Sequence, residues 1–432
     1  MGLAIGVMIY VLLGRLGIRR WAAALAAAPI LLDAYQLIFE EFVLAETLFA
    51  FLLVAGCAAL LWNRRPGIVE AGIAGALFAG VSLTRANGFF VFGPAFLAIL
   101  CQLWEPRRGR LRAAIPALLP AAALVCAFGL PVAAYATWFH YRHGSFAITS
   151  RGGDFLYGRV APFADCKRFS VPAEERILCP GQPIGHRPRL QGSTVNWYMW
   201  ARFGDNTSPR FKILAQPGGD KLPARFARRA ILAQPWDYFS AVSHDFLRGF
   251  APIRTRHDDE LPISRWQFSP KYPVYSKFTP GILREHGDAP GRSRPALGRF
   301  LRDYQRFGFT WGPVLALGMI AGLLAALGLG RARRSGLRTA AFLFAAMALV
   351  TFGSTVAVNT FTWRYQIILV TLLPPAAALG LTALLRRPDE PPFSEAPESP
   401  SRRTDRYPAR TSLVGSTEPH HSAGDSHLGG TP

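Results

Sequence analysis

Long apolar runs, separated by short turns rich in arginine, fill both ends of the chain. A helix needs roughly 20 apolar residues to cross a bilayer, and most of the runs are close to that length. They predict membrane helices at residues 21–39, 43–62, 68–84, 86–104, 113–138, 309–330, 338–358 and 366–385, with a further apolar segment at 2–13. The pattern therefore predicts an all-α polytopic membrane protein with about eight or nine transmembrane helices.

Polar segments divide the chain into four parts. Residues 1–138 form an N-terminal transmembrane bundle, and residues 139–308 form a large loop domain in which we expect mixed, mainly helical structure. Residues 309–385 return to the membrane as the last helices. Residues 386–432 are rich in Pro, Ser, Glu and Arg, and such a segment has too few apolar residues to bury a core. We expect it to be a disordered tail.

The net charge of +21 comes from 48 Lys and Arg against 27 Asp and Glu. Arginines gather in every second turn between the apolar runs, which is the positive-inside pattern of a membrane protein. The positive charge is therefore explained by the orientation of the protein in the lipid bilayer, and we expect no nucleic acid as a partner. The pattern places the basic turns and the tail in the cytoplasm and residues 139–308 outside the plasma (inner) membrane. It also starts residues 2–13 outside, so we expect the natural protein to carry an earlier helix.

The five cysteines fall into two groups. Cys57, Cys101 and Cys126 lie within apolar runs, where a thiol usually serves as a packing residue. Cys166 and Cys179 lie in the loop domain, and outside the cell such a pair usually forms a disulfide. We expect that bond here.

Acidic residues mark the outer end of one apolar run, in the segment FEEFVLAETLFAFL. Glu46 lies one turn into that run, where it has either a functional partner or a helix-capping role favoured by the helix dipole. For Glu40 and Glu41 capping or solvent exposure is the better interpretation. Asp33 lies deepest in an apolar run, and its candidate partners are Arg85 and an element upstream of the chain.

Two arginines stand at the outer side, against the positive-inside trend. Arg85 ends one apolar run in LTRANG, and Arg364 precedes the last run in NTFTWRYQ. Guanidinium groups bind phosphate with two parallel hydrogen bonds and stay charged in apolar surroundings. Both residues are therefore candidates for a lipid phosphate; snorkelling to the interface or an Arg–Glu pair within the bundle is the alternative.

Two further segments of the loop domain are each compatible with two roles. Residues 254–260 read RTRHDDE, which could bind a divalent cation but more often forms a solvated turn. Pro223–Leu247 has the pattern of an amphipathic helix interrupted at Pro235, either on the membrane or on an ordinary protein surface.

Three phrases of the sequence resemble the lipid-carrier-dependent glycosyltransferases of the GT-C superfamily, in particular the protein O-mannosyltransferases and the bacterial aminoarabinose transferases. They are FEEFVLAETLFAFL, GIAGALFAGVSLTRANG and WRYQIILVTLLPPAAALGL. The resemblance implies transfer of a sugar from a polyprenyl-phosphate donor to a protein, lipid or glycan acceptor at the outer membrane face, with inversion at the anomeric carbon.

The resemblance also implies roles for individual residues. Glu46 matches the acid at the start of a later helix that binds acceptor or metal, with Glu41 as a second catalytic candidate. Arg85, Arg364 and Asp33 are the candidates for the site of the donor phosphate. A divalent metal ion is the one cofactor that the resemblance suggests.

One part of the family pattern has no counterpart in the sequence. The family's first helix and first outer loop, which carries the catalytic base, would precede Met1, in agreement with the topology argument. We expect the activity of the chain to depend on that part. A transporter or flippase for a lipid-linked glycan, or a non-catalytic binding protein, is the competing interpretation, although the inverted repeats typical of transporters are not evident.

Overall fold

The computed structural model describes residues 1–42, 44–104, 114–203, 206–213, 221–255, 259–271, 281, 284–285 and 293–386. The described N-terminal part consists of α1 (Gly2–Arg15), α2 (Arg20–Leu32), α3 (Ala34–Glu41), α4 (Ala45–Leu61), α5 (Ile68–Thr84), η1 (Ala86–Val91), α6 (Phe92–Trp104) and α7 (Ala114–His143). The C-terminal part consists of α15 (Gly312–Ala326), η5 (Gly330–Arg334), α16 (Arg338–Val358), η6 (Trp363–Tyr365) and α17 (Gln366–Leu385). The predicted tail begins at 386, and its residues 387–432 lie outside the described residues.

Each predicted membrane segment is occupied by helix, although the lengths differ. Among the described residues, three helices are long and apolar enough to cross a membrane: Leu118–His143, Arg338–Val358 and Trp363–Leu385. The pair α2 and α3 could form a fourth span and is bent by 51°, while five further apolar helices have 10–17 residues. The chain is therefore a helical membrane protein, and the number of eight or nine spans stays a prediction.

The continuous helix predicted at 21–39 is wrong, because the chain breaks at Asp33. Asp33 has an extended backbone, and its carboxylate accepts hydrogen bonds from the backbone N–H groups of Tyr35 and Gln36 at the start of α3. An aspartate at this position caps a new helix more readily than it continues an old one. The apolar pattern alone does not reveal this break.

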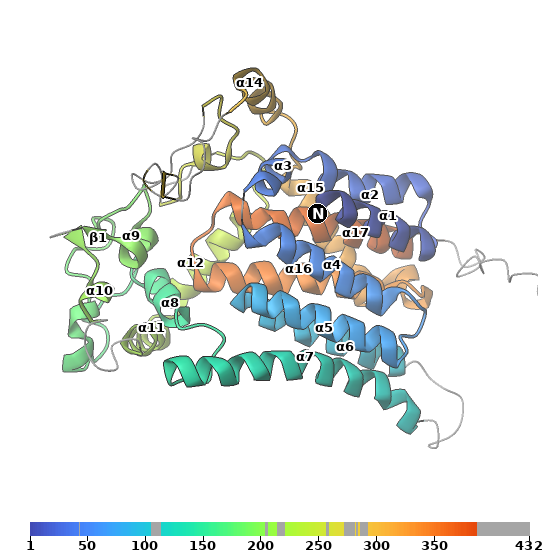
Figure 1. Ribbon diagram of the computed structural model, residues 1–432, viewed down its shortest axis with the longest axis horizontal. Coiled ribbons are helices and arrows are strands. Elements are labelled where there is room, and N and C mark those ends of the chain that lie inside the picture. The colour runs from blue at the N-terminus through green and yellow to red at the C-terminus, as the bar shows by residue number, and fades with distance from the viewer. Residues whose placement is uncertain are drawn as a thin grey trace, which may run out of the picture. The chain divides into compact units, whose positions relative to one another are not determined.

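Figure 1 shows the apolar helices side by side in a bundle, and small residues bring them close together. α5 packs against α4 and α7, while α17 packs against α15, α16 and α2, which joins the two ends of the chain in one bundle. A Cβ atom at Gly75 would lie 2.6 Å from the carbonyl oxygen of Leu124, and one at Gly380 would lie 2.5 Å from that of Ala321. Packing in membranes depends on such close backbone approach.

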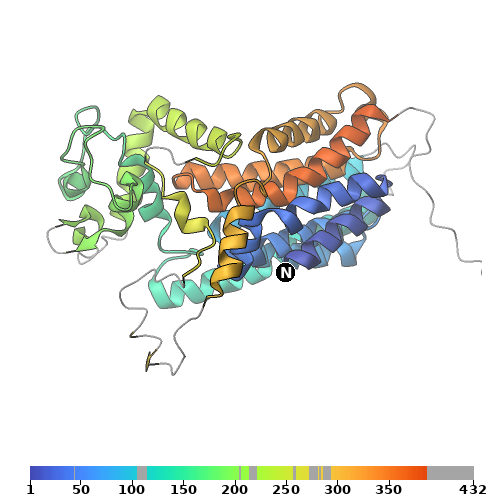
Figure 2. The ribbon, with the colours of Figure 1, turned by 90° about the horizontal axis from the view of Figure 1, so that it is seen from above.

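The loop domain gathers beyond one end of this bundle, as Figures 1 and 2 both show. Its described elements are α8 (Gly152–Val160), η3 (Ala173–Leu178), α9 (Thr194–Trp200), β1 (Arg202–Phe203), β2 (Asn206–Thr207), α10 (Pro209–Ile213), α11 (Leu222–Ala233), α12 (Pro235–Arg248), η4 (Ile263–Trp266) and α14 (Pro295–Tyr304). The two strands form one short antiparallel pair. The predicted interruption at Pro235 is confirmed, since α11 ends at Ala233 and α12 begins at Pro235.

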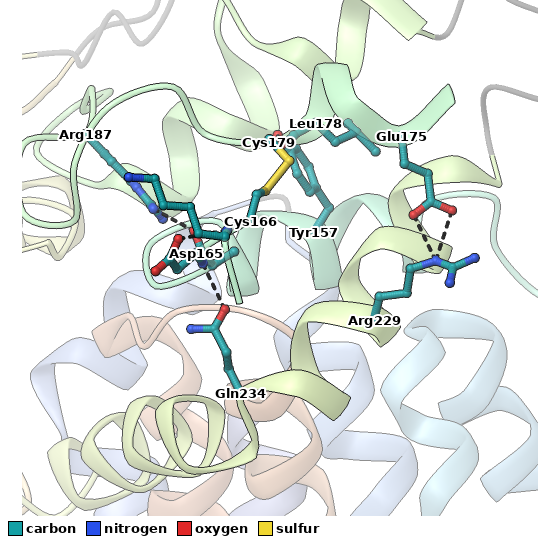
Figure 3. Close-up of a disulfide and its surroundings, with 11 residues drawn as sticks. Tyr157, Asp165, Cys166, Glu175, Leu178, Cys179, Arg187, Arg229 and Gln234 are labelled. Atoms are coloured by element: carbon teal, nitrogen blue, oxygen red, sulfur yellow. Dashed lines mark hydrogen bonds and ion pairs between the residues drawn. A yellow bond between two sulfur atoms is a disulfide. The ribbon is translucent and has the colours of Figure 1, made fainter. Parts of the chain in front are cut away.

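A second hydrophobic core lies within this domain, beside the disulfide that joins Cys166 and Cys179 (Figure 3). The hydroxyl group of the buried Tyr157 donates a hydrogen bond of 2.9 Å to the carbonyl oxygen of Leu178. Gln234, at the start of α12, accepts a hydrogen bond from the backbone N–H of Asp165 at 2.8 Å. The first bond joins α8 to η3, and the second connects the disulfide loop to α12, which packs on α16.

Candidate functional site

Glu46 stands in the first turn of α4 and is almost fully buried, with 3% of its side chain exposed. Its Oε1 atom lies 2.6 Å from the Nη1 atom of Arg85 and 3.1 Å from the Nε atom of Arg364. The first contact is a hydrogen bond, while the second is an ion pair without hydrogen-bond alignment. We refer to Glu46, Arg85, Arg364 and the adjoining Tyr365 as the Glu46 cluster.

The turn that carries Arg85 is fixed to α16. Arg85 leaves the end of α5 in an extended conformation, and the next residues form η1. Asn87 donates hydrogen bonds to the hydroxyl of Thr355 at 2.8 Å and to the carbonyl oxygen of Thr351 at 3.3 Å. Within the LTRANG segment, the side-chain amide of Asn87 thus anchors the turn that positions Arg85.

The second arginine of the cluster lies on η6, just before α17. Thr362 accepts a hydrogen bond from the backbone N–H of Arg364 at 3.4 Å and so caps this short helix. The ring of Tyr365 lies 5.2 Å from the guanidinium carbon of Arg364 and 5.4 Å from that of Arg85. One aromatic ring therefore faces both cations, a contact that favours the charged guanidinium.

Two tryptophans, Trp266 beside Arg364 and Trp363 on the same short helix as Arg364, have an indole N–H with no hydrogen-bond partner among the described residues. The Nε1 atoms of Trp266 and Trp363 are buried and unpaired there, with 6% and 2% of each residue exposed. The ring of Trp266 lies 5.7 Å from the guanidinium carbon of Arg364. Buried donors without partners are rare in native proteins and call for an explanation, such as a ligand that accepts their bonds.

The Glu46 cluster has an excess of positive charge. Two guanidiniums face one carboxylate, and within the described part of the chain both contacts involve Oε1 while Oε2 accepts no hydrogen bond. The side chains of Arg85 and Arg364 stay 17% and 28% exposed. The arrangement is suited to an anion on the arginines and to a hydrogen-bond donor on the open carboxylate oxygen.

Asp33 belongs to a different cluster, in which every contact is internal. Its carboxylate accepts five hydrogen bonds: from the backbone of Tyr35 and Gln36, twice from Arg254, and from the backbone of Thr310 at 2.7 Å. The predicted pairing with Arg85 is wrong, because Arg254 takes that place and Arg85 pairs with Glu46. Sequence reasoning missed Arg254, which it treated as part of a polar turn.

The other acids of the FEEF segment do not join the Glu46 cluster. Glu41 is exposed at the end of α3, and Glu40 accepts hydrogen bonds from Gly2 and Gln36, each at 3.2 Å. For Glu40 and Glu41, capping or solvent exposure was the better interpretation, and their positions agree with it. Glu46 lies in the first turn of α4, where the helix dipole favours a carboxylate, and its partners among the described residues are the guanidiniums of Arg85 and Arg364.

The described residues offer a divalent cation no suitable set of ligands. No group of three or more His, Cys, Asp or Glu side chains that could hold a metal is found among them. Glu46 would be a single carboxylate between two guanidiniums, whereas Ca²⁺ and Mg²⁺ need several oxygen ligands. In segment 254–260, Glu260 pairs with Arg248 and Asp259 accepts a hydrogen bond from Thr194, while His257 and Asp258 lie outside the described residues.

Comparison with known proteins bears on the N-terminal part of this site. Residues 1–143 match the family model of the dolichyl-phosphate-mannose-protein mannosyltransferases. The match includes Glu46 and Arg85 and leaves Arg364 outside. It supports a membrane glycosyltransferase of GT-C type that uses a lipid-linked sugar donor and a protein acceptor, in general terms. No curated protein and no solved structure matches the chain.

Proposed function

We propose that this protein transfers a sugar from a polyprenyl-phosphate donor to an acceptor hydroxyl at the outer face of the plasma membrane. The observation that carries the proposal is the convergence of Glu46, Arg85 and Arg364 from three separated segments of the chain. Ionisable groups within a helical membrane protein are costly unless they have a partner or a function. Here the three groups are paired, yet the Oε2 atom of Glu46 and parts of both guanidiniums stay available to bind a ligand.

In this proposal, Arg85 and Arg364 hold the phosphate of the donor. Their forked N–H groups match phosphate oxygens, and their charge stabilises the phosphate as it departs. The unpaired indole N–H of Trp266, whose ring lies beside Arg364, is a further donor near the same region. No step of this proposal passes through a metal ion, because the described residues of the cluster supply one carboxylate between two guanidiniums.

Glu46 serves the acceptor. While both guanidiniums face its Oε1 atom, its charge is compensated, and a donor phosphate competes for them. The carboxylate then accepts the proton of the acceptor hydroxyl, within hydrogen-bond reach of its open oxygen. This proposal gives Glu46 the role of general base, in place of the outer-loop acid that the resemblance implies. The hydroxyl oxygen forms a bond to the anomeric carbon as the bond to the phosphate oxygen breaks, with inversion, and polyprenyl phosphate leaves.

The orientation follows from the distribution of arginines. Basic turns such as Arg64–Arg65 follow the ends of the helices opposite to the Glu46 cluster, and this positive-inside trend supports our proposal that the cluster and the loop domain lie outside the cell and the tail lies in the cytoplasm. A sugar linked to a lipid phosphate is already activated, so the outer face needs no nucleotide. A protein acceptor agrees best with the family match.

The test is turnover by the purified protein in proteoliposomes. The probes are polyprenyl-phosphate mannose labelled in the sugar and short peptides rich in Ser and Thr. A transferase releases polyprenyl phosphate and labels the peptide. A transporter would move the intact donor between leaflets without breaking the bond, and that result would replace the proposal with the competing one.

A further inference from the structure

A second concave site lies apart from the Glu46 cluster, between α3, α14 and the chain around Arg254. It is a cavity of about 330 Å³, and no member of the Glu46 cluster lines it. Its lining consists of arginine, glutamine and aromatic or aliphatic side chains: Tyr35, Ile253, Arg254, Gln267, Arg302, Gln305, Arg306 and Phe309. Its described lining therefore contains three cations and no carboxylate.

The three guanidiniums differ in how far their charge is compensated. Arg254 is neutralised and oriented by the buried Asp33 behind it. Arg306 pairs with Asp303 at 3.4 Å, but 78% and 63% of these side chains are exposed, so the pair is weak. Arg302 donates one hydrogen bond, to the carbonyl oxygen of Phe268 at 3.3 Å, and no carboxylate in the described part of the chain pairs with it. The cavity thus favours an anion.

Exposed apolar side chains continue from the cavity toward the membrane. Phe300 on α14 is 66% exposed, and Phe307 and Trp311, which lead into α15, are 72% and 61% exposed. Aromatic residues of this kind gather where a membrane meets water. α15 begins at Gly312, directly after Trp311, so the membrane span predicted at 309–330 would put α14 and its arginines at the membrane surface.

We propose that this cavity binds the phosphate of an anionic membrane phospholipid. Arg302 and Arg306 hold the phosphate, Arg254 forms the rear of the site, and the acyl chains lie along the exposed aromatic side chains between Phe300 and Trp311. Basic pockets next to membrane helices bind lipid headgroups in this way. The site is independent of sugar transfer and would fix α14, and with it the loop domain, to the membrane surface.

The experiment measures binding of short-chain phosphatidic acid to the purified full-length protein in neutral detergent. Arg302→Gln should weaken binding about tenfold, the effect of losing one strong charge-assisted contact. Arg306→Gln, at an exposed position that folding does not depend on, should weaken it about threefold. The matched control is Arg299→Gln, which removes the same charge from the same helix outside the cavity and should change binding less than about twofold.

Three outcomes would overturn the inference. Equal losses for Arg299→Gln and Arg302→Gln would mean diffuse attraction to a basic surface. Equal binding of inorganic phosphate and phosphatidic acid would mean a site for a soluble anion. Unchanged binding in both Arg302→Gln and Arg306→Gln would mean that the lipid, if bound, lies elsewhere.

Discussion

Two acid–arginine clusters lie at the same side of the helical bundle. They differ in how many of the hydrogen-bonding atoms of the carboxylate already have a partner. Asp33 gives all of its carboxylate to five hydrogen bonds, and its partner Arg254 is also bonded to Gln366 at 2.9 Å. Glu46 contacts two arginines through one oxygen and leaves the other open among the described residues. The side chains of the first pair are 5% and 1% exposed, whereas Arg85 and Arg364 remain partly accessible.

This difference distinguishes a carboxylate that stabilises the fold from one that can bind a ligand. A carboxylate whose bonds are all satisfied positions the chain: Asp33 breaks the apolar run, caps α3 and attaches the loop domain through Arg254. A carboxylate with one open oxygen, beside two partly accessible guanidiniums and the unpaired indole of Trp266, can still bind a ligand. The same two residue types in the same membrane region therefore carry different roles, and geometry rather than residue type distinguishes them.

The largest expected effect is on stability at Asp33. Asp33→Asn leaves the buried Arg254 without its charge partner, which should lower the free energy of unfolding by about 3–5 kcal/mol. Thermal unfolding in detergent measures the loss. The control is Glu174→Gln, which breaks an exposed pair with Arg225 and should change stability by less than about 0.5 kcal/mol. A similar, small change in both variants would refute the structural role of Asp33.

A smaller effect is expected at the two arginines of the Glu46 cluster. Arg85→Lys and Arg364→Lys keep the charge but lose the fork that binds two phosphate oxygens. Each should weaken the affinity for polyprenyl-phosphate mannose about tenfold, with little change in stability. The same exchange at Arg299, on the loop domain, should leave donor affinity unchanged. Unaltered affinity in both cluster variants would remove the arginines from the phosphate site.

The smallest effect is a pH dependence at a third carboxylate, Asp259 of the loop domain. Burial raises its pKa above the usual 3.8, although a backbone hydrogen bond from Thr194 acts in the opposite direction. The folded state then holds the proton more tightly than the unfolded state, so stability falls as the pH rises from about 3.8 through the raised pKa.

The variant Asp259→Asn tests this dependence. It keeps an acceptor for Thr194 and tolerates the positive φ of 67° at this position. We expect it to be more stable than the natural chain at pH 7 and equally stable near pH 3, as measured by denaturant unfolding of the loop domain within the whole protein. A stability difference that does not vary with pH would contradict the prediction.

Much of the fold could be predicted from the sequence, because apolar runs and basic turns report directly on membrane helices. Glu46, Arg85 and Arg364 could also be selected, since each is a charge placed against the local trend. Their mutual contact could not be predicted, because it depends on how α4, α5 and η6 pack against one another. The role of Arg254 stayed hidden in the RTRHDDE segment, where an arginine among polar residues gives no signal.

The central claim is that Glu46 takes part in sugar transfer, and Glu46→Gln tests it most directly. The matched control is Glu70→Gln, a glutamate in the first turn of the next helix, whose carboxylate accepts a hydrogen bond from Gly67. Peptide mannosylation in proteoliposomes should fall at least about 100-fold in Glu46→Gln, with donor binding retained, because general-base assistance contributes that much. Glu70→Gln should stay close to the natural rate. Equal turnover by the natural chain and Glu46→Gln would contradict the account.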